Sequence, residues 1–282
     1  MRLVYLGTPA LAVPPLQALV ASGHDVALVV SAPDKRRGRG NAESPTPVKA
    51  AALDLGLRVS TSVDDALALD PPAQLGIVAA FGQIIRPHML AALPMLNLHF
   101  SLLPRWRGAA PVERAILAGD ERTGVCVMAV EEGLDTGGVY ARAEVAIGVD
   151  TTADDLRAEL VARGTALLLE TLAKDLAAPQ PQAGEATYAN KIDPSELEVD
   201  WRQQPEQVHR LVRVGGAWTT SAGRRLKLWR TTLDPEAEGA VAVPCGDGRI
   251  GLLEVQPEGK GRMTAAAWVN GAHVAPDRAL GR

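Results

Sequence analysis

Asn97-Leu-His-Phe-Ser-Leu-Leu-Pro-Arg-Trp-Arg-Gly-Ala-Ala-Pro111 joins the end of a predicted strand, Leu96 to Ser101, to an arginine-rich loop. Asn97 and His99 are two residues apart, so on a strand both side chains leave the same face. Asparagine is depleted in strands, and a buried amide without partners is costly, so Asn97 needs a specific task there. The stretch therefore predicts a polar site at the carboxyl edge of a sheet, where open α/β folds bind ligands.

Strand and helix signals alternate around this stretch in the first half of the chain. Helix-like segments such as Pro15 to Ala21 and Pro47 to Leu55 separate short apolar runs, and a longer helical signal covers Ala153 to Ala177. The pattern predicts an α/β domain with a Rossmann-like, mostly parallel sheet. The predicted strands are Leu3 to Leu6, Val26 to Val30, Leu75 to Ala80, Leu96 to Ser101, Gly124 to Val130 and Val139 to Ile147.

The character of the sequence changes after this domain. Pro179-Gln-Pro-Gln-Ala-Gly184 has the composition of a linker. Beyond it, one helical stretch, Glu206 to Val214, precedes short alternating segments separated by glycine-rich turns, which predicts a small β-barrel. We expect a first domain over residues 1–178, a linker over 179–204 and a second domain over 205–282.

Composition limits the class of protein further. The chain has 282 residues and a net charge of -4, which argues against indiscriminate nucleic-acid binding but leaves room for local basic patches. No apolar run reaches membrane-spanning length and the start shows no signal peptide, so we expect a cytoplasmic protein without membrane contact. Cys126 and Cys245 are isolated and the five histidines lack metal-binding spacing, so we expect no metal.

A second polar candidate lies downstream in the turn Gly133-Leu-Asp-Thr-Gly-Gly138, between two predicted strands. Taken alone, Asp135 is explained by turn chemistry, since Asp and Gly are ordinary turn formers. His99 alone would be read as a packed or solvated histidine, and Asn97 as a residue that ties down a loop. Exposed leucines in Leu102-Leu103-Pro104 suggest a wall for a flat ligand, although the loop could equally fold onto the core.

At these residues the chain resembles the formyltransferases that use 10-formyltetrahydrofolate. Their pattern is Asn-x-His-x-Ser-Leu-Leu-Pro followed downstream by Asp-Thr-Gly, matched here from Asn97 to Pro104 and by Asp135 to Gly137. The extension Arg105 to Pro111 is typical of the branch that formylates initiator methionyl-tRNA. Further matches make the resemblance cover nearly the whole chain: Gly7 to Pro9, Pro33-Asp34 with Gly38 to Gly40, Pro45 to Lys49, Ala79 to Gly82, and Lys191 before Asp200-Trp201.

The resemblance implies a reaction without a covalent enzyme intermediate. The amino group of the methionyl ester attacks the formyl carbon on N10 of the folate and forms a tetrahedral oxyanion. The Asn97 amide and a protonated His99 are expected to donate hydrogen bonds to that oxyanion. Asp135 would orient the imidazole, and it or a bound water would take the amine proton. The residues implied for the folate cleft are Ser101, Leu102, Leu103, Pro104, Ala80, Phe81, Gly82 and Ile84.

The same resemblance implies that the second domain is an OB-like, tRNA-binding domain. The glycine-interspersed basic loop around Arg39 suits contacts to phosphates and acceptor-stem bases, with Arg39 as its main reader. Basic runs also occur as plain solvated surface, and those on the barrel could serve solubility. The candidate tRNA contacts are Arg36, Arg37, Arg39, Lys191, Arg225 and Lys227, and we expect a monomer.

Two positions depart from the family pattern. Phe100 stands where relatives often carry a small residue or proline, and Val214-Gly-Gly-Ala217 replaces much of a Pro-Trp-Pro stretch, for which Trp218 is the remaining counterpart. Two other classes of function stay open. A formyltransferase for an amino sugar or nucleotide sugar, or a formyl-folate hydrolase, would share the three polar residues but lack the arginine-rich extension. A non-catalytic tRNA- or folate-binding protein would have no need of all three.

Overall fold

The computed structural model describes residues 1–37, 42–272 and 280–281, and the chain forms two compact units. Unit 1 consists of Met1–Pro111, Arg122–Ala146 and Arg157–Asn190, and unit 2 of Val112–Glu121, Ile147–Leu156 and Lys191–Arg282. Two short segments from earlier in the chain therefore group with the C-terminal residues. The expected domain bounds at residues 178 and 205 stay a prediction.

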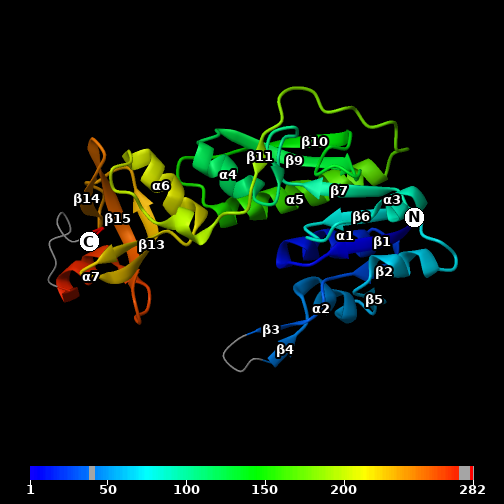
Figure 1. The fold of residues 1–282 in the computed structure, drawn as a ribbon, viewed down its shortest axis with the longest axis horizontal. Coiled ribbons are helices and arrows are strands. Elements are labelled where there is room, and N and C mark those ends of the chain that lie inside the picture. The colour runs from blue at the N-terminus through cyan, green and yellow to red at the C-terminus, as the bar shows by residue number, and fades with distance from the viewer. Residues whose placement is uncertain (38–41, 273–279, 282) are drawn as a thin grey trace. The chain divides into compact units, whose positions relative to one another are not determined.

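Unit 1 is built on a seven-stranded sheet with the strand order β10-β9-β7-β6-β1-β2-β5 (Figure 1). The strands from β5 to β7 in this order run parallel, whereas β9 is antiparallel to both β7 and β10. The predicted Rossmann-like, mostly parallel sheet is confirmed. The strands are β1 (Arg2–Gly7), β2 (Asp25–Val30), β5 (Val59–Ser60), β6 (Leu75–Ala79), β7 (Met95–His99), β9 (Arg122–Ala129) and β10 (Val139–Ala146).

Helices connect these strands, and α1, α2, α3 and α4 each have a proline in their first turn, where its fixed φ suits the helix. In α2 (Pro47–Asp54) the hydroxyl of Thr46 also caps the helix by accepting a hydrogen bond from Lys49 N at 3.2 Å. α4 (Pro111–Ala118) and α5 (Ala153–Leu172) contain residues of both units. The remaining elements of unit 1 are η1 (Ala10–Ala12), α1 (Val13–Ala21), β3 (Lys35–Arg37), β4 (Ala42–Ser44), η2 (Val63–Ala68), α3 (Pro87–Ala92), β8 (Arg107–Gly108) and β11 (Tyr188–Ala189).

Alternation along β7 decides which side chains reach each face of the sheet. Leu98 faces α5, since a Cβ added to Gly164 of that helix would lie 3.6 Å from Leu98 Cδ2. Met95 lies on the other face, in a buried cluster with residues of η2 and α3. Asn97 and His99 share the parity of Met95, so both lie on the face away from α5.

The long helix α5 ends at Leu172, earlier than the predicted Ala177. The chain then extends beside β10, where the backbones of Val139 and Gln180 exchange two hydrogen bonds of 2.8 and 2.9 Å. Hydrogen bonds to the sheet edge thus replace those of a further helical turn. The segment read from composition as a linker is in part attached to the sheet.

Unit 2 contains a curled antiparallel sheet in the order β12-β13-β15-β14, with β16 paired to β15. Its buried core includes Val212 of α6, Leu228 of β13 and Trp268 of α7. The sequence predicted a small, OB-like β-barrel in this part of the chain, and the structure has a curled antiparallel sheet there. The elements are η3 (Pro194–Leu197), α6 (Pro205–Val214), β12 (Trp218–Ser221), β13 (Arg224–Thr232), β14 (Val241–Cys245), β15 (Gly248–Pro257), β16 (Met263–Thr264) and α7 (Ala265–Ala272).

The departure at residues 214–218 has a local explanation. Gly215 and Gly216 have φ angles of 94° and 81°, which L side chains rarely adopt, and they end α6. Trp218 then opens β12. None of the helices in the described ranges is long and apolar enough to cross a membrane.

Candidate active site

Asn97 and His99 occupy the carboxyl end of β7, as predicted. In the ladder, Asn97 lies between Val78 of β6 and Met128 of β9, and His99 pairs with Cys126 of β9. Asn97 is half-buried, and its side-chain amide has no hydrogen-bond partner among the described residues. A carboxamide held among apolar neighbours without a partner is costly, so this one is available to a ligand.

His99 is 5% exposed, and both ring nitrogens face protein groups. Nε2 lies 2.8 Å from the carbonyl oxygen of Trp106. A carbonyl oxygen only accepts hydrogen bonds, so Nε2 carries the hydrogen. Nδ1 lies 3.6 Å from Oδ2 of Asp135 and is therefore the nitrogen that can gain or lose a proton. An oxyanion could receive the Nε2 hydrogen only if the Trp106 carbonyl moved away.

Asp135 comes from the connection between β9 and β10 and has a φ angle of 50°, in the left-handed region. Its side chain is 14% exposed, and Oδ2 accepts a hydrogen bond of 2.8 Å from the backbone N–H of Gly108. This bond fixes one carboxylate oxygen towards His99. The fold thus brings together two residues that the sequence could only propose as partners.

The loop after β7 folds onto the sheet. β7 ends at His99 rather than at Ser101, because the buried Ser101 hydroxyl donates to the Arg105 carbonyl oxygen at 2.6 Å and begins a turn. Leu103 is 2% exposed and clusters with Cys126 and other residues of β9 and β10. The expectation of an exposed leucine wall is therefore wrong for Leu103, whose side chain is used by the core. Leu102, Pro104 and Phe100 are half-buried.

The loop after β6 turns sharply at Ala80 and Gly82, which have φ angles of 46° and 74°. Phe81 between them is buried in the core, and its carbonyl oxygen accepts a hydrogen bond from the Thr8 hydroxyl at 3.2 Å. Ile84 is 92% exposed. The loop therefore offers backbone groups and one exposed apolar side chain, while the phenyl ring faces inwards.

Cys126 lies beside the loop that follows β7, on the same face of the sheet as His99. Burial raises the pKa of its thiol, although hydrogen bonding from the Leu103 backbone and the charge of Arg142 act in the opposite direction. A buried thiol with a raised pKa is a poor nucleophile. Cys126 therefore serves in the packing under the loop.

The segment of residues 179–190, which looked like a linker, returns to form hydrogen bonds with the loop that follows β7. β11 pairs with β8, matching Tyr188 to Arg107 and Ala189 to Gly108. The hydroxyl of Thr187 accepts a hydrogen bond of 2.9 Å from Trp106 N. Nothing in the local pattern of residues 179–190 indicates this pairing, because two-residue strands have no periodicity to detect.

The expected tRNA-contacting residues are scattered over the chain. Arg39 lies outside the described residues, and the structure describes Arg36 and Arg37 only as backbone of β3. Lys191 of unit 2 is exposed. Arg225 and Lys227 are exposed on β13, where the Arg225 guanidinium lies over the ring of Trp218 with 4.0 Å to its centre. The two cations therefore lie beside an aromatic ring on the same sheet.

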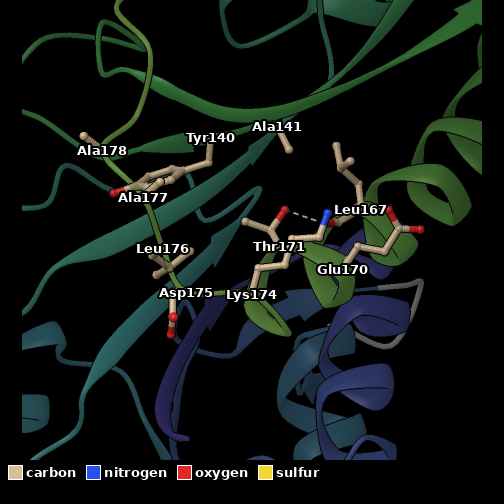
Figure 2. Close-up of a pocket in the computed structure, with 10 residues that line it drawn as sticks. All are labelled: Tyr140, Ala141, Leu167, Glu170, Thr171, Lys174, Asp175, Leu176, Ala177 and Ala178. Atoms are coloured by element: carbon tan, nitrogen blue, oxygen red, sulfur yellow. Dashed lines mark hydrogen bonds between the residues drawn. The ribbon is translucent and has the colours of Figure 1, made fainter.

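A cavity of about 180 Å³ lies elsewhere in unit 1, between β10 and the end of α5. Figure 2 shows Tyr140 and Ala141 of β10 on one side, and Thr171 of α5 with Lys174, just after that helix, on the other. None of the expected site residues lines it. Within the described residues, no group of three or more His, Cys, Asp or Glu is placed to hold a metal ion.

Sequence comparisons match both parts of the chain to known proteins. Residues 1–172 match the family described as formyl transferase, and residues 191–273 match the formyl transferase C-terminal domain. A methionyl-tRNA formyltransferase of Jannaschia sp. (strain CCS1) is 44% identical, over 99% of this chain and 100% of that protein.

Two solved structures are similar in fold. The methionyl-tRNA formyltransferase from Clostridium thermocellum has a TM-score of 0.61 and 17% identity, over 93% of this chain and 100% of that one. The N-formyltransferase from Helicobacter canadensis, in complex with folinic acid and dTDP-3-aminofucose, has a TM-score of 0.69 and 17% identity, over 90% of this chain and 98% of that one. At this identity both structures support the fold alone.

Proposed function

Because this chain belongs to the formyl transferase family, we propose that it transfers the formyl group of 10-formyltetrahydrofolate to the free amino group of initiator methionyl-tRNA. The observation that carries the proposal is the pairing of His99 with Asp135 beside the partnerless amide of Asn97. The similarity to a methionyl-tRNA formyltransferase along its full length supports the choice of acceptor.

Asn97 is the donor we assign to the oxyanion. When the methionyl nitrogen bonds to the formyl carbon, the carbonyl π electrons move to the formyl oxygen, which becomes negative. A fixed N–H group in a partly dry site stabilises that charge more than it stabilises the neutral carbonyl. The Asn97 amide is available for this because no described residue uses it.

His99 and Asp135 are the pair we assign to the proton of the attacking amine. Nδ1 of His99 has a free lone pair when the ring is neutral, and it lies 3.6 Å from Oδ2 of Asp135. The proton leaves the nitrogen as the new C–N bond forms. The proton taken from the amine balances the proton delivered to N10 of the folate. As the oxyanion forms the C=O bond again, the C–N10 bond breaks, and the products are tetrahydrofolate and formylmethionyl-tRNA.

The formyl donor suits the two loops next to this cluster. Ala80, Gly82 and Ile84 supply backbone groups and an exposed apolar side chain, which fit the polar edge and flat face of a pterin. We assign Phe81 and Leu103 to the walls behind these loops, because both side chains are buried. Ser101, Leu102 and Pro104 complete the proposed cleft.

The tRNA acceptor suits the cationic residues. Arg225 and Lys227 have no ion-pair partner in the described part of the chain, and the stretch of sequence with Arg36, Arg37 and Arg39 is rich in arginine. We propose Lys191 as a further contact, and residues 1–178 and 205–282 as the catalytic and tRNA-binding domains. A monomeric state and a cytoplasmic location remain predictions.

The decisive assay combines the purified protein with 10-formyltetrahydrofolate and methionyl-tRNA. We expect formylmethionyl-tRNA to form in proportion to the tetrahydrofolate released, and N-acetylated methionyl-tRNA, which lacks the nucleophile, to remain unchanged. Formyl transfer to a nucleotide-linked amino sugar without transfer to methionyl-tRNA would contradict the proposal. Binding of both substrates without turnover would assign the chain to a non-catalytic class.

A further inference from the structure

Gln182 forms hydrogen bonds both to the segment that follows His99 and to the turn that contains Asp135. Its side-chain oxygen Oε1 accepts hydrogen bonds from Nε and Nη2 of Arg107, at 3.1 and 2.6 Å. Its side-chain nitrogen Nε2 donates to the carbonyl oxygens of Asp135 and Gly137, both at 2.8 Å. All four contacts lie within unit 1.

The chemistry of these contacts favours an amide over other side chains. Guanidinium groups only donate and backbone carbonyls only accept, so the group between them needs an acceptor atom on one side and a donor on the other. A carboxamide supplies both without a net charge. Because each half of the amide has partners of one kind, its orientation is also fixed.

One segment joined by Gln182 contacts His99, and the other contains Asp135. Arg107 lies between Trp106, whose carbonyl oxygen accepts from His99 Nε2, and Gly108, whose N–H donates to Asp135 Oδ2. The other loop contains Asp135 itself. The bridge from Arg107 to the Asp135 carbonyl therefore limits how far the imidazole and the carboxylate can move apart.

We propose that Gln182 is a positioning residue that sets the alignment of His99 and Asp135. It touches neither reacting atom and acts through the loops. This inference rests on the proposed function for its kinetic consequences, but the geometry of His99 can be tested without any turnover. The donated hydrogen bonds to the Asp135 turn carry the effect, and the bond to Arg107 anchors the amide.

Two substitutions separate these contributions. Gln182→Ala removes both halves of the bridge. Gln182→Glu keeps an acceptor for Arg107, which favours a stable fold, but loses the donor to the two carbonyl oxygens. We expect both variants to lower kcat by about 10- to 100-fold, since a misplacement of ~1 Å costs on the order of 10²-fold. KM for both substrates should change by less than about threefold.

The matched control is Gln180→Ala, two residues earlier on the same segment. Gln180 is exposed and contributes backbone hydrogen bonds to β10, so this variant should keep the wild-type kcat. Full activity of Gln182→Glu, or a raised KM with unchanged kcat in both Gln182 variants, would overturn the proposal.

The second readout is the His99 ring proton in nitrogen-15 NMR spectra, assigned by comparison with His99→Gln. Wild-type protein should show a hydrogen-bonded Nε2–H that exchanges slowly with water, and Gln182→Ala should broaden it or speed its exchange. An unchanged signal in Gln182→Ala would refute the positioning role. Lack of transfer to methionyl-tRNA by the wild type would refute only the proposed function, because this measurement does not depend on turnover.

Discussion

His99 Nδ1 lies 3.6 Å from Oδ2 of Asp135, while the other ring nitrogen, Nε2, donates to the Trp106 carbonyl oxygen. One side of the ring is thus occupied by a backbone carbonyl, and the other side faces the Asp135 carboxylate. This arrangement favours proton acceptance at Nδ1 as the role of His99. It leaves the Asn97 amide as the donor for a negative formyl oxygen.

Asp135→Asn should lower kcat by about 10²- to 10⁴-fold, the usual contribution of a general acid or base. The asparagine oxygen can still accept from Gly108 N–H, so the turn should keep its conformation. Single-turnover formyl transfer to methionyl-tRNA measures the loss. Glu132→Gln, at an exposed position of the same connection, is the matched control and should keep full activity. Equal rates for Asp135→Asn and wild type would exclude the proton-accepting role.

Asn97→Asp should lower kcat by about 10²- to 10³-fold, as expected for the loss of one oxyanion donor. Aspartate has nearly the same shape but no N–H, and its charge repels an oxyanion. Asn97→Ala should lose activity to a similar extent while the melting temperature stays close to that of wild type, because no described residue bonds to the amide. A large fall in melting temperature with retained kcat would make Asn97 a structural residue instead.

Arg225→Ala and Lys227→Ala should raise KM for methionyl-tRNA and leave kcat almost unchanged, because a phosphate contact adds binding but no chemistry. Each loss should reduce the slope of log affinity against log salt by about 1. Filter binding of the tRNA over a salt series measures this slope. Arg249→Ala removes an equal charge from β15, where the guanidinium donates to the Ala242 carbonyl oxygen. Arg249→Ala should leave the slope unchanged. If the slope fell equally in all three variants, the effect would come from the net charge of the protein and not from contacts of Arg225 and Lys227 with phosphates.

Acidification should destabilise the protein through His209, which is 3% exposed in unit 2. Burial lowers the pKa of this imidazole, and the Arg213 charge adds to the effect, although the Val149 carbonyl and Asp150 favour the charged ring. Below about pH 6.5, the ordinary histidine pKa, the unfolded chain therefore binds more protons than the folded one. The stabilisation is present above that value and is lost as the pH falls towards the folded-state pKa.

Urea unfolding between about pH 7.5 and pH 5.5 tests the direction in which stability changes with pH. The free energy of unfolding should fall with the pH in wild type, and less steeply in His209→Gln. His88→Gln changes a side chain that is half exposed and should preserve the wild-type slope. A His209→Gln slope equal to that of wild type would remove His209 as the source.

Local patterns were sufficient for much of the fold and for the main site residues. The predicted strand Leu96 to Ser101 agrees with β7 within two residues at each end, because the alternation of apolar and polar side chains is a property of neighbouring residues. Parity along that strand also placed Asn97 and His99 on one face. In contrast, the pattern extended α5 to Ala177, because its apolar spacing continues beyond Leu172, where the chain leaves the helix before it pairs with β10 at Gln180.

Contacts between distant parts of the chain explain what the sequence patterns missed. Composition alone predicted that Gln182 lies in a linker. In the structure its side chain bonds to Arg107 and Asp135, which lie far from it in the chain. Leu103 looked like part of an exposed wall, but the loop turns its side chain into the core with β9 and β10. Neither outcome has a periodic signal, since each depends on one loop meeting another.

The sequence by itself determined the class of fold, the type of chemistry and the family, because strand parity, helix spacing and motif spacing are local properties. Only the tertiary structure decided that Asp135 faces His99, that Trp106 occupies Nε2, and that residues 112–121 and 147–156 group with the C-terminal unit. These relationships arise when segments far apart in the chain share hydrogen bonds and a buried surface. Their free energy depends on the folded arrangement rather than on the order of residues in any one segment.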